Sequence, residues 1–211
     1  MRVLIFGATG NIGRHVREEA LGAGHDLVLF ARDPAKLDPL EDGEQSVAGD
    51  VADADAVRDA IDGIEAVISV LGPRSNSPEQ EEVFVAFASA LVAAMQARGV
   101  ARLVALSGAA VRVPGENKRP LDRLASLVIG KAVRHVVQAK QRELDIIAAS
   151  RLDWIAPRPP RVVDGPLTGE YRVGDHSVGP RSRISTPDLA EFIVACLTDD
   201  EHLRTAPFIS Y

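Results

Sequence analysis

Cysteine is nearly absent from this sequence, which contains only Cys196. One cysteine cannot form an intrachain disulfide, so nothing supports a disulfide-stabilised protein of an oxidising compartment. Cys196 lies in an apolar stretch, which favours a small buried side chain over a reactive thiol. Long apolar runs are missing too: none reaches the roughly 18 residues of a membrane span, and the chain enters a strand without a signal-peptide pattern. We therefore expect a cytoplasmic protein with no membrane partner.

Basic residues are fewer than acidic ones, and clustered metal ligands are missing. The chain has 24 Lys and Arg against 30 Asp and Glu, a formal net charge of −6. This balance argues against nucleic acid as the main partner, although it allows a local anion site. The five histidines are scattered, so we predict no metal site and infer no Ser-His-Asp arrangement.

A tyrosine followed four residues later by a lysine is also missing. The chain's two tyrosines, Tyr171 and Tyr211, lack that lysine, and Lys140 lacks the tyrosine. A carbonyl reduction in which a tyrosine protonates a developing alkoxide therefore has no evident acid. An extended conjugated acceptor, such as an isoalloxazine ring or a tetrapyrrole, fits this absence better because it depends less on such an acid.

Apolar residues, by contrast, suffice for one sizeable core. They make up 46% of 211 residues, which favours a single domain over residues 1–211. Strand-like runs at about 2–6, 26–30, 45–48, 65–70, 101–106 and 153–157 alternate with helical patterns, which predicts an α/β fold with a doubly wound parallel sheet. After Trp154 the chain becomes rich in Pro, Gly and Arg, so we expect a small C-terminal substrate-side lobe over 158–186. A polar loop at 112–120 could cover a site.

Three glycines stand where the first strand should become a helix. The sequence FGATGNIG places Gly7, Gly10 and Gly13 three residues apart. Glycine there permits a tight bend, close approach of a pyrophosphate to backbone N–H groups, and close packing of helix on strand. The helix N-terminus adds partial positive charge. Glycine triplets also occur in plain turns, but in this strand–turn–helix context we favour a dinucleotide-binding turn.

The helices carry signals of their own. After the glycine turn, the charged residues Arg14, Arg17 and Glu18 fall opposite the apolar positions, which predicts that they face solvent. Residues 77–80, SPEQ, form a capping-box pattern that begins a long helix, apolar nearly all round. Burial of that helix is favoured over a subunit contact. Thr186, which precedes a proline, is expected to cap the last helix.

The second strand ends in ARDPAKL, where a cofactor's adenosine ribose would lie. Arg32 comes first and Lys36 follows one turn later. An arginine at this place accommodates a 2′-phosphate, whereas an acidic residue would bind the ribose hydroxyl. Asp33 is acidic, but before a proline it is better interpreted as the cap of a short helix. We therefore predict NADP(H), with NAD(H) as the less favoured cofactor; a solvated pair of Arg32 and Lys36 is the alternative.

The ends of later strands supply further candidate contacts. Asp50 could bind the adenine amino group, with the Val51 backbone beside the ring, or could cap a helix from about residue 53. Ser107 ends the fifth strand, near the expected nicotinamide, because ligands bind at the carboxyl edge of doubly wound sheets. The end of the fourth strand adds Leu71, Gly72 and Arg74.

These segments resemble the atypical short-chain dehydrogenase/reductases, most closely the flavin reductase (NADPH) and biliverdin-IXβ reductase group of the NmrA-like NAD(P)-binding proteins. The resemblance rests on GATGNIG, ARDPAKL, GDV and LGPR, and above all on PPRVVDGPLTGEYRV and SRISTPDLA. It implies a Rossmann fold, and Pro160, Arg161 and Val162 beside the nicotinamide. The cofactor contacts that it implies are Gly7, Thr9, Gly10, Asn11, Ile12, Arg32, Lys36, Asp50, Val51, Leu71, Gly72, Arg74 and Ser107.

The resemblance further implies hydride transfer from the nicotinamide to a flavin or another planar acceptor, which the protein mainly orients. Ser107 and Arg161 are the expected catalytic residues, and Lys140 is either a helix residue near the cofactor or a solvated lysine. An NmrA-like redox sensor that binds NADP without turnover is the alternative, and a nucleotide-sugar epimerase is disfavoured. For the oligomeric state we expect a monomer or a weak homodimer.

Overall fold

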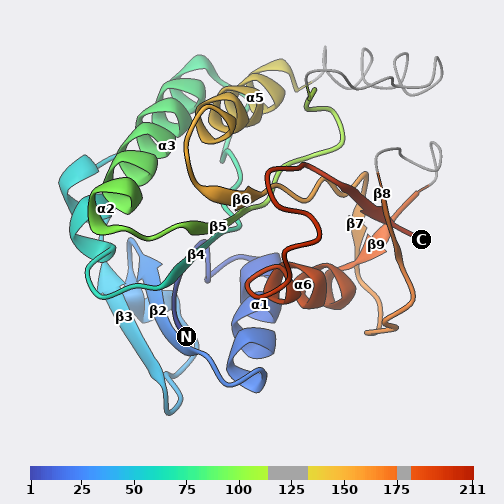
Figure 1. Ribbon diagram of the computed structural model, residues 1–211, viewed down its shortest axis with the longest axis horizontal. Coiled ribbons are helices and arrows are strands. Elements are labelled where there is room, and N and C mark those ends of the chain that lie inside the picture. Colours follow the sequence, from blue (N-terminus) through green and yellow to red (C-terminus); the bar gives the residue numbers. More distant parts are fainter. Residues whose placement is uncertain (114–132, 175–181) are drawn as a thin grey trace.

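The computed structural model describes residues 1–113, 133–174 and 182–211. Its central sheet has six parallel strands in the order β3-β2-β1-β4-β5-β6 (Figure 1). This is the strand order of the Rossmann fold, so the predicted fold class is confirmed. Each predicted strand run overlaps one of these strands, which are Arg2–Phe6 (β1), Asp26–Ala31 (β2), Glu44–Ala48 (β3), Ala66–Ser69 (β4), Arg102–Ala105 (β5) and Asp153–Ile155 (β6).

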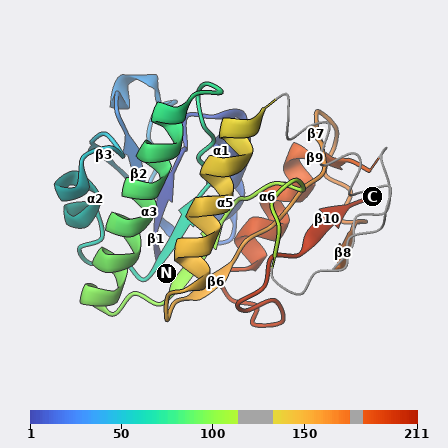
Figure 2. The ribbon, with the colours of Figure 1, turned by 90° about the horizontal axis from the view of Figure 1, so that it is seen from above.

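Helices cover both faces of the sheet (Figures 1 and 2). One face carries α2 (Ala54–Ala60), α3 (Pro78–Arg98) and α5 (Arg134–Ala148), and the other carries α1 (Asn11–Gly22) and α6 (Thr186–Ala195). Each face has its own apolar cluster. Because β1 is covered on both sides, its residues from Val3 to Phe6 are all apolar and fully buried, without the alternation of a half-exposed strand.

The long helix α3 is buried along one side. Phe84, Phe87 and Leu91 pack into the core, whereas Ala86 and Ala93 are exposed. The helix ends at Gly99, whose φ of 70° lies in the left-handed region that favours glycine. The end of this helix is therefore fixed by local sequence.

The capping-box prediction at the start of α3 is wrong. Ser77 is the N-cap and Pro78 the first helical residue, as predicted, but Ser77 makes no side-chain cap hydrogen bond. Gln80 instead turns away, and its Oε1 accepts a hydrogen bond from the Arg74 backbone N–H at 3.0 Å. Gln80 thus supports the loop after β4.

The cap of α6 is one residue earlier than predicted. Ser185 is the N-cap, and its Oγ accepts a hydrogen bond from the Asp188 backbone N–H at 3.2 Å. Thr186 is the first helical residue. Cys196, at the end of this helix, is 2% exposed, and burial raises the pKa of its thiol to about 12.

Arg17 contradicts the prediction that it faces solvent. It is 6% exposed, and its guanidinium donates to both carboxylate oxygens of Glu44 at 2.5 Å. It also donates to the carbonyl oxygens of Asp38 and Pro39. Burial raises the pKa of Glu44, but the hydrogen bonds from Arg17 and the Glu41 N–H, together with the charge of Arg17, outweigh it and the net shift is downward. Arg17 thus connects α1 to the start of β3 and to the chain between β2 and β3.

The C-terminal part of the chain forms a small lobe beside α6 (Figure 1). In it β7 (Val162–Val163) pairs in parallel with β9 (Ile184–Ser185), and β8 (Arg172–Gly174) pairs antiparallel with β10 (Phe208–Ser210). Residues 175–181 of the expected lobe and 114–120 of the expected loop lie outside the described residues.

Candidate active site

The glycine turn joins β1 to α1. The Gly10 N–H donates to the Gly7 carbonyl at 3.0 Å, and Gly7 has a φ of 95°. A Cβ on Gly13 would lie 2.0 Å from the Gly7 carbonyl oxygen, so a side chain there would separate the helix from the turn. Gly10 caps α1 without a side-chain hydrogen bond. The start of α1 therefore lacks the usual side-chain acceptor and suits an anionic ligand.

A cavity of about 270 Å³ opens beside this turn. It lies at the carboxyl edge of β1, β2 and β4, the switch point at which doubly wound sheets bind ligands. Its wall is completed by Phe30, Ala31, Gly49 and Val70. The predicted cofactor residues that it brings together are Gly7, Thr9, Gly10, Arg32, Val51, Leu71, Gly72 and Arg74.

Of the two cations that follow β2, Arg32 lines the cavity and Lys36 extends into solvent. Arg32 borders the cavity and is exposed. Asp33 caps the short helix η1 (Pro34–Lys36), since its Oδ1 accepts from the Ala35 N–H at 3.2 Å, as predicted. The side chain of Lys36 is 75% exposed, and its Nζ lies 3.9 Å from the Asp33 carboxylate. Arg32 is therefore the better placed of the two cations for a phosphate in the cavity.

A second cavity, of about 220 Å³, continues along the same edge. Asp50 borders it, and its Oδ1 accepts from the Ala52 N–H at 3.0 Å. The alternative that Asp50 caps the next helix is wrong, because Asp53 caps α2. The two cavities share Val51, Leu71, Gly72 and Arg74.

Ser107 lies just beyond β5. Its N–H donates to the Pro157 carbonyl at 2.9 Å, which fixes the backbone. Its Oγ is buried and has no hydrogen-bond partner within the described part of the chain. A buried hydroxyl that lacks a partner costs free energy unless a ligand or water supplies one. Ser107 itself lines neither of the two cavities.

Lys140 is buried, so the alternative of a solvated lysine is wrong. It is 8% exposed, and its Nζ donates to the Leu71 carbonyl at 3.0 Å, at the wall shared by the two cavities. Glu143 lies one turn along α5, with its Oε2 2.5 Å from that Nζ. Burial raises the pKa of Glu143, although Lys140 opposes the shift. The pair supports the wall of the cavity from behind.

The remaining predicted residues lie on α1 and on the lobe, and none lines either of these two cavities. Asn11 is exposed, and Ile12 packs against the apolar cluster beneath α6. Pro160 and Val162 are half-buried and Arg161 is exposed, on the segment that forms β7.

A hydrogen-bond network that the sequence patterns did not predict joins α1, α6 and this segment. Asn11 Nδ2 donates to Thr186 Oγ1 at 3.4 Å, and Thr186 Oγ1 donates to the Val163 carbonyl at 3.3 Å. Fully buried Asp188 accepts from the Thr168 and Gly169 N–H groups. The Ser-x-x-Asp pattern at 185–188 was the available signal, since it is typical of a helix start.

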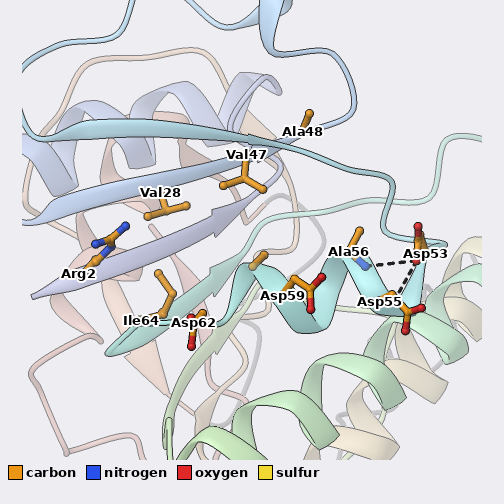
Figure 3. Close-up of a pocket in the computed structure, with 11 residues that line it drawn as sticks. Arg2, Val28, Val47, Ala48, Asp53, Asp55, Ala56, Asp59, Asp62 and Ile64 are labelled. Carbon is orange, nitrogen blue, oxygen red and sulfur yellow. Dashed lines mark hydrogen bonds between the residues drawn. The ribbon is translucent and has the colours of Figure 1, made fainter.

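A third cavity, of about 450 Å³, lies between α2 and strands β2 and β3 (Figure 3). Its carboxylates already have partners: Asp53 caps α2, Asp55 pairs with Arg58, and Asp62 pairs with Arg98. None of the predicted site residues lines it. We therefore do not assign the site to this larger cavity.

Neither a metal centre nor a membrane-spanning helix is found in the described part of the chain. Among residues 1–113, 133–174 and 182–211, no cluster of three or more His, Cys, Asp or Glu side chains could hold a metal ion. No helix in the same ranges has the length and apolar character needed to cross a membrane.

A family model described as NAD(P)H-binding matches residues 7–200. The chain belongs to this family. Among curated relatives of this NAD(P)H-binding protein, (4-alkanoyl-5-oxo-2,5-dihydrofuran-3-yl)methyl phosphate reductase of Streptomyces griseus is 28% identical over 218 residues, covering 99% of this chain and 67% of the relative. The chain spans only 34% of the length of 3 beta-hydroxysteroid dehydrogenase/Delta 5-->4-isomerase from two strains of Mycobacterium tuberculosis, to which it is 32% identical over 126 residues.

Solved structures share the fold along nearly the whole chain. ChuY, an anaerobillin reductase from Escherichia coli O157:H7, has a TM-score of 0.79 at 18% identity and covers 99% of this chain and 96% of its own. A short-chain dehydrogenase/reductase from Veillonella parvula, in complex with NADP, has a TM-score of 0.77 at 16% identity and covers 100% and 94%. At these identities the likeness shows the fold.

Proposed function

We propose that the protein is an NADPH-dependent reductase that transfers hydride to a flavin or another planar conjugated acceptor. The observation that carries the proposal is the cavity at the carboxyl edge, where the glycine turn, the start of α1 and Arg32 border one space. The proposal also places the chain with the NmrA-like, atypical short-chain dehydrogenase/reductases.

The residues of this edge fit a dinucleotide. The uncapped start of α1 suits a pyrophosphate, and neither Gly7 nor Gly13 has room for a Cβ, so the turn and the helix pack closely. Arg32 would bind a 2′-phosphate through a charge-assisted hydrogen bond, which favours NADPH over NADH. Asp50, on the second cavity, would bind the adenine amino group.

The acceptor half of the proposal rests on a tyrosine that is missing from α5 and on two residues, Ser107 after β5 and Arg161 before β7. Val136 stands four residues before Lys140, where the tyrosine of the Tyr-x-x-x-Lys pair would stand. A bound NADPH supplies the hydride, and Ser107 and Arg161 orient the nicotinamide and the acceptor. The Streptomyces relative is named a reductase and ChuY an anaerobillin reductase, and both names support this reaction type.

The experiment is a steady-state assay of NADPH oxidation by the purified protein. FMN, FAD, biliverdin and simple quinones are offered separately, and NADH replaces NADPH in a matched series. The expected result is turnover with at least one planar acceptor and a higher kcat/KM for NADPH. Tight NADPH binding without oxidation by any acceptor would contradict the proposal and favour an NmrA-like redox sensor.

A further inference from the structure

We propose that Asp188 is a positioning residue that fixes the acceptor side of the site by anchoring residues 164–169 to the start of α6. This inference rests on the proposed function, because it concerns how that site presents its acceptor surface. Asp188 is 0% exposed, and it lies in the first turn of α6. A buried carboxylate is costly unless hydrogen bonds replace its hydration. Its partners therefore decide what it does.

The partners come from three separate parts of the lobe. Asp188 Oδ1 accepts from the backbone N–H groups of Thr168 at 2.7 Å and Gly169 at 2.9 Å. Its Oδ2 accepts from the Thr168 hydroxyl at 2.8 Å and from the Tyr211 hydroxyl. The Ser185 hydroxyl, 3.0 Å from the same oxygen, has one proton to share between Asp188 and the Pro166 carbonyl.

These hydrogen bonds belong to a longer series of contacts between residues 184–188 and residues 161–169. The short strand β9 pairs with β7, and the Ile184 N–H donates to the Arg161 carbonyl at 2.9 Å. Next along the chain, Thr186 reaches the Val163 carbonyl. Residues 184–188 thus lie alongside the segment 161–169. The β7–β9 pairing binds the first part of this segment, and Asp188 binds its last residues, Thr168 and Gly169.

The same attachment reaches the dinucleotide turn. Thr186 Oγ1, which contacts the segment, also accepts from the Asn11 side chain at the first position of α1. α6 itself packs on α1, and both contribute to one buried apolar cluster. The acceptor-side segment is therefore held by α6 and, through Thr186 and Asn11, is connected to α1, the helix that follows the glycine turn. Its position relative to a bound dinucleotide is set before either ligand binds, which lowers the cost of orienting the acceptor.

The chemistry of the network explains why a carboxylate is needed there. Two backbone N–H groups and two hydroxyls converge on Asp188, and an ionised carboxylate accepts all of them at once. An asparagine of the same shape offers a single acceptor oxygen and an N–H₂ group that opposes those donors. Asp188→Asn should therefore release the segment 164–169 without changing the volume of the core.

The experiment compares the wild type with Asp188→Asn and, as a matched control, Glu170→Gln, which alters an exposed carboxylate of the same lobe. NADP⁺ is titrated first, and FMN is then titrated into NADP⁺-saturated protein. For Asp188→Asn we expect the Kd of FMN to rise about tenfold or more, while the Kd of NADP⁺ changes less than about twofold. Tyr211→Phe, which removes one donor, should give a smaller rise in the Kd of FMN, and Glu170→Gln none.

The outcomes separate this inference from the proposed function. FMN binding by Asp188→Asn that equals wild-type binding overturns the inference alone. Equal weakening of NADP⁺ and FMN also overturns it, because a general structural role would affect both ligands. Wild-type protein that binds NADP⁺ but none of FMN, FAD, biliverdin or a quinone overturns the acceptor proposal and this inference together.

Discussion

Arg32 is the residue on which the choice of cofactor depends. It borders the cavity at the end of β2, and its charge is not engaged by Asp33, whose carboxylate caps η1 and lies near Lys36. We expect Arg32→Ala to weaken NADPH binding about tenfold or more while changing NADH binding little, because only NADPH carries the 2′-phosphate. Calorimetric titration with both cofactors measures this, with Arg151→Ala, another exposed arginine, as the control. Equal loss for both cofactors would remove Arg32 from the phosphate site.

Lys140 and Glu143 form a buried ion pair at the wall of the candidate site, and the charge of each depends on the other. Replacing Lys140 with methionine leaves a buried carboxyl group uncompensated, so we expect a loss of about 3 kcal/mol in the free energy of unfolding. Burial already raises the pKa of Glu143, and loss of Lys140 removes the opposing effect. In the variant, Glu143 then has a higher pKa in the folded state than in the unfolded state. The variant should therefore lose stability as pH rises above the usual glutamate pKa.

Urea unfolding of Lys140→Met at about pH 5 and about pH 8 measures this dependence. The deficit relative to wild type should be larger at the higher pH. The double variant Lys140→Met with Glu143→Gln should lose that pH dependence, because glutamine does not titrate. The same deficit at both pH values would show that the loss is one of packing rather than of charge.

At the scale of elements, the close fit of α1 against the glycine turn leaves no room for a side chain at Gly13. A Cβ there would lie 2.0 Å from the Gly7 carbonyl oxygen, so Gly13→Ala must displace α1 or the turn. We expect it to lower the free energy of unfolding by about 2 kcal/mol or more and to weaken NADPH binding. Gly22→Ala is the control within the same helix, since its Cβ would meet nothing within 4 Å. A Gly13→Ala protein as stable as Gly22→Ala would contradict the close approach.

The hydrogen bonds between Asp188 and the lobe should also make the free energy of unfolding depend on pH in the acid range. Burial tends to raise the pKa of Asp188, but hydrogen bonds from Tyr211, Thr168 and Gly169 outweigh it and hold the pKa at about 2. A lowered pKa gives stability that is present above the usual aspartate value and is lost as pH falls toward about 2. The contribution is about 2 kcal/mol. Thermal unfolding of wild type and Asp188→Asn between about pH 5 and about pH 2 should converge as pH falls; a constant difference would contradict this.

At the scale of the whole molecule, the local features were predictable and the long-range pairs were not. Strands β1, β2 and β4 are mostly apolar and buried, and Gly99 ends α3 through its own left-handed conformation. Eight of the predicted cofactor residues line one cavity because strand ends and the glycine turn occupy a fixed edge of this fold. The strands, the end of α3 and the residues of this cavity could be predicted because each depends on a short stretch of sequence.

Arg17 and Gln80 were predicted wrongly, and Lys140 was left open between two alternatives, for one physical reason. Each is a polar residue on or near a helix whose partner lies elsewhere in the chain: Glu44 for Arg17, the Arg74 N–H for Gln80, and the Leu71 carbonyl for Lys140. Helical periodicity predicts which face of the helix a residue occupies, but it does not predict whether another part of the chain supplies a hydrogen-bond partner at that face. The hydrogen bonds of Asp188 could not be predicted for the same reason, because Thr168 and Tyr211 are distant in sequence and contact Asp188 only in the folded lobe.

The most direct test of hydride transfer is a single-turnover experiment. Protein saturated with NADPH is mixed with the acceptor that gave turnover, or with FMN if none did, and NADPH oxidation is followed over time. The measurement is repeated with NADPH deuterated at each of the two faces of the nicotinamide C4. A reductase of the proposed kind should oxidise its bound NADPH, and one deuterated form, not both, should react more slowly. NADPH that stays bound and unoxidised would contradict the proposed reaction and leave a cofactor-binding protein without turnover.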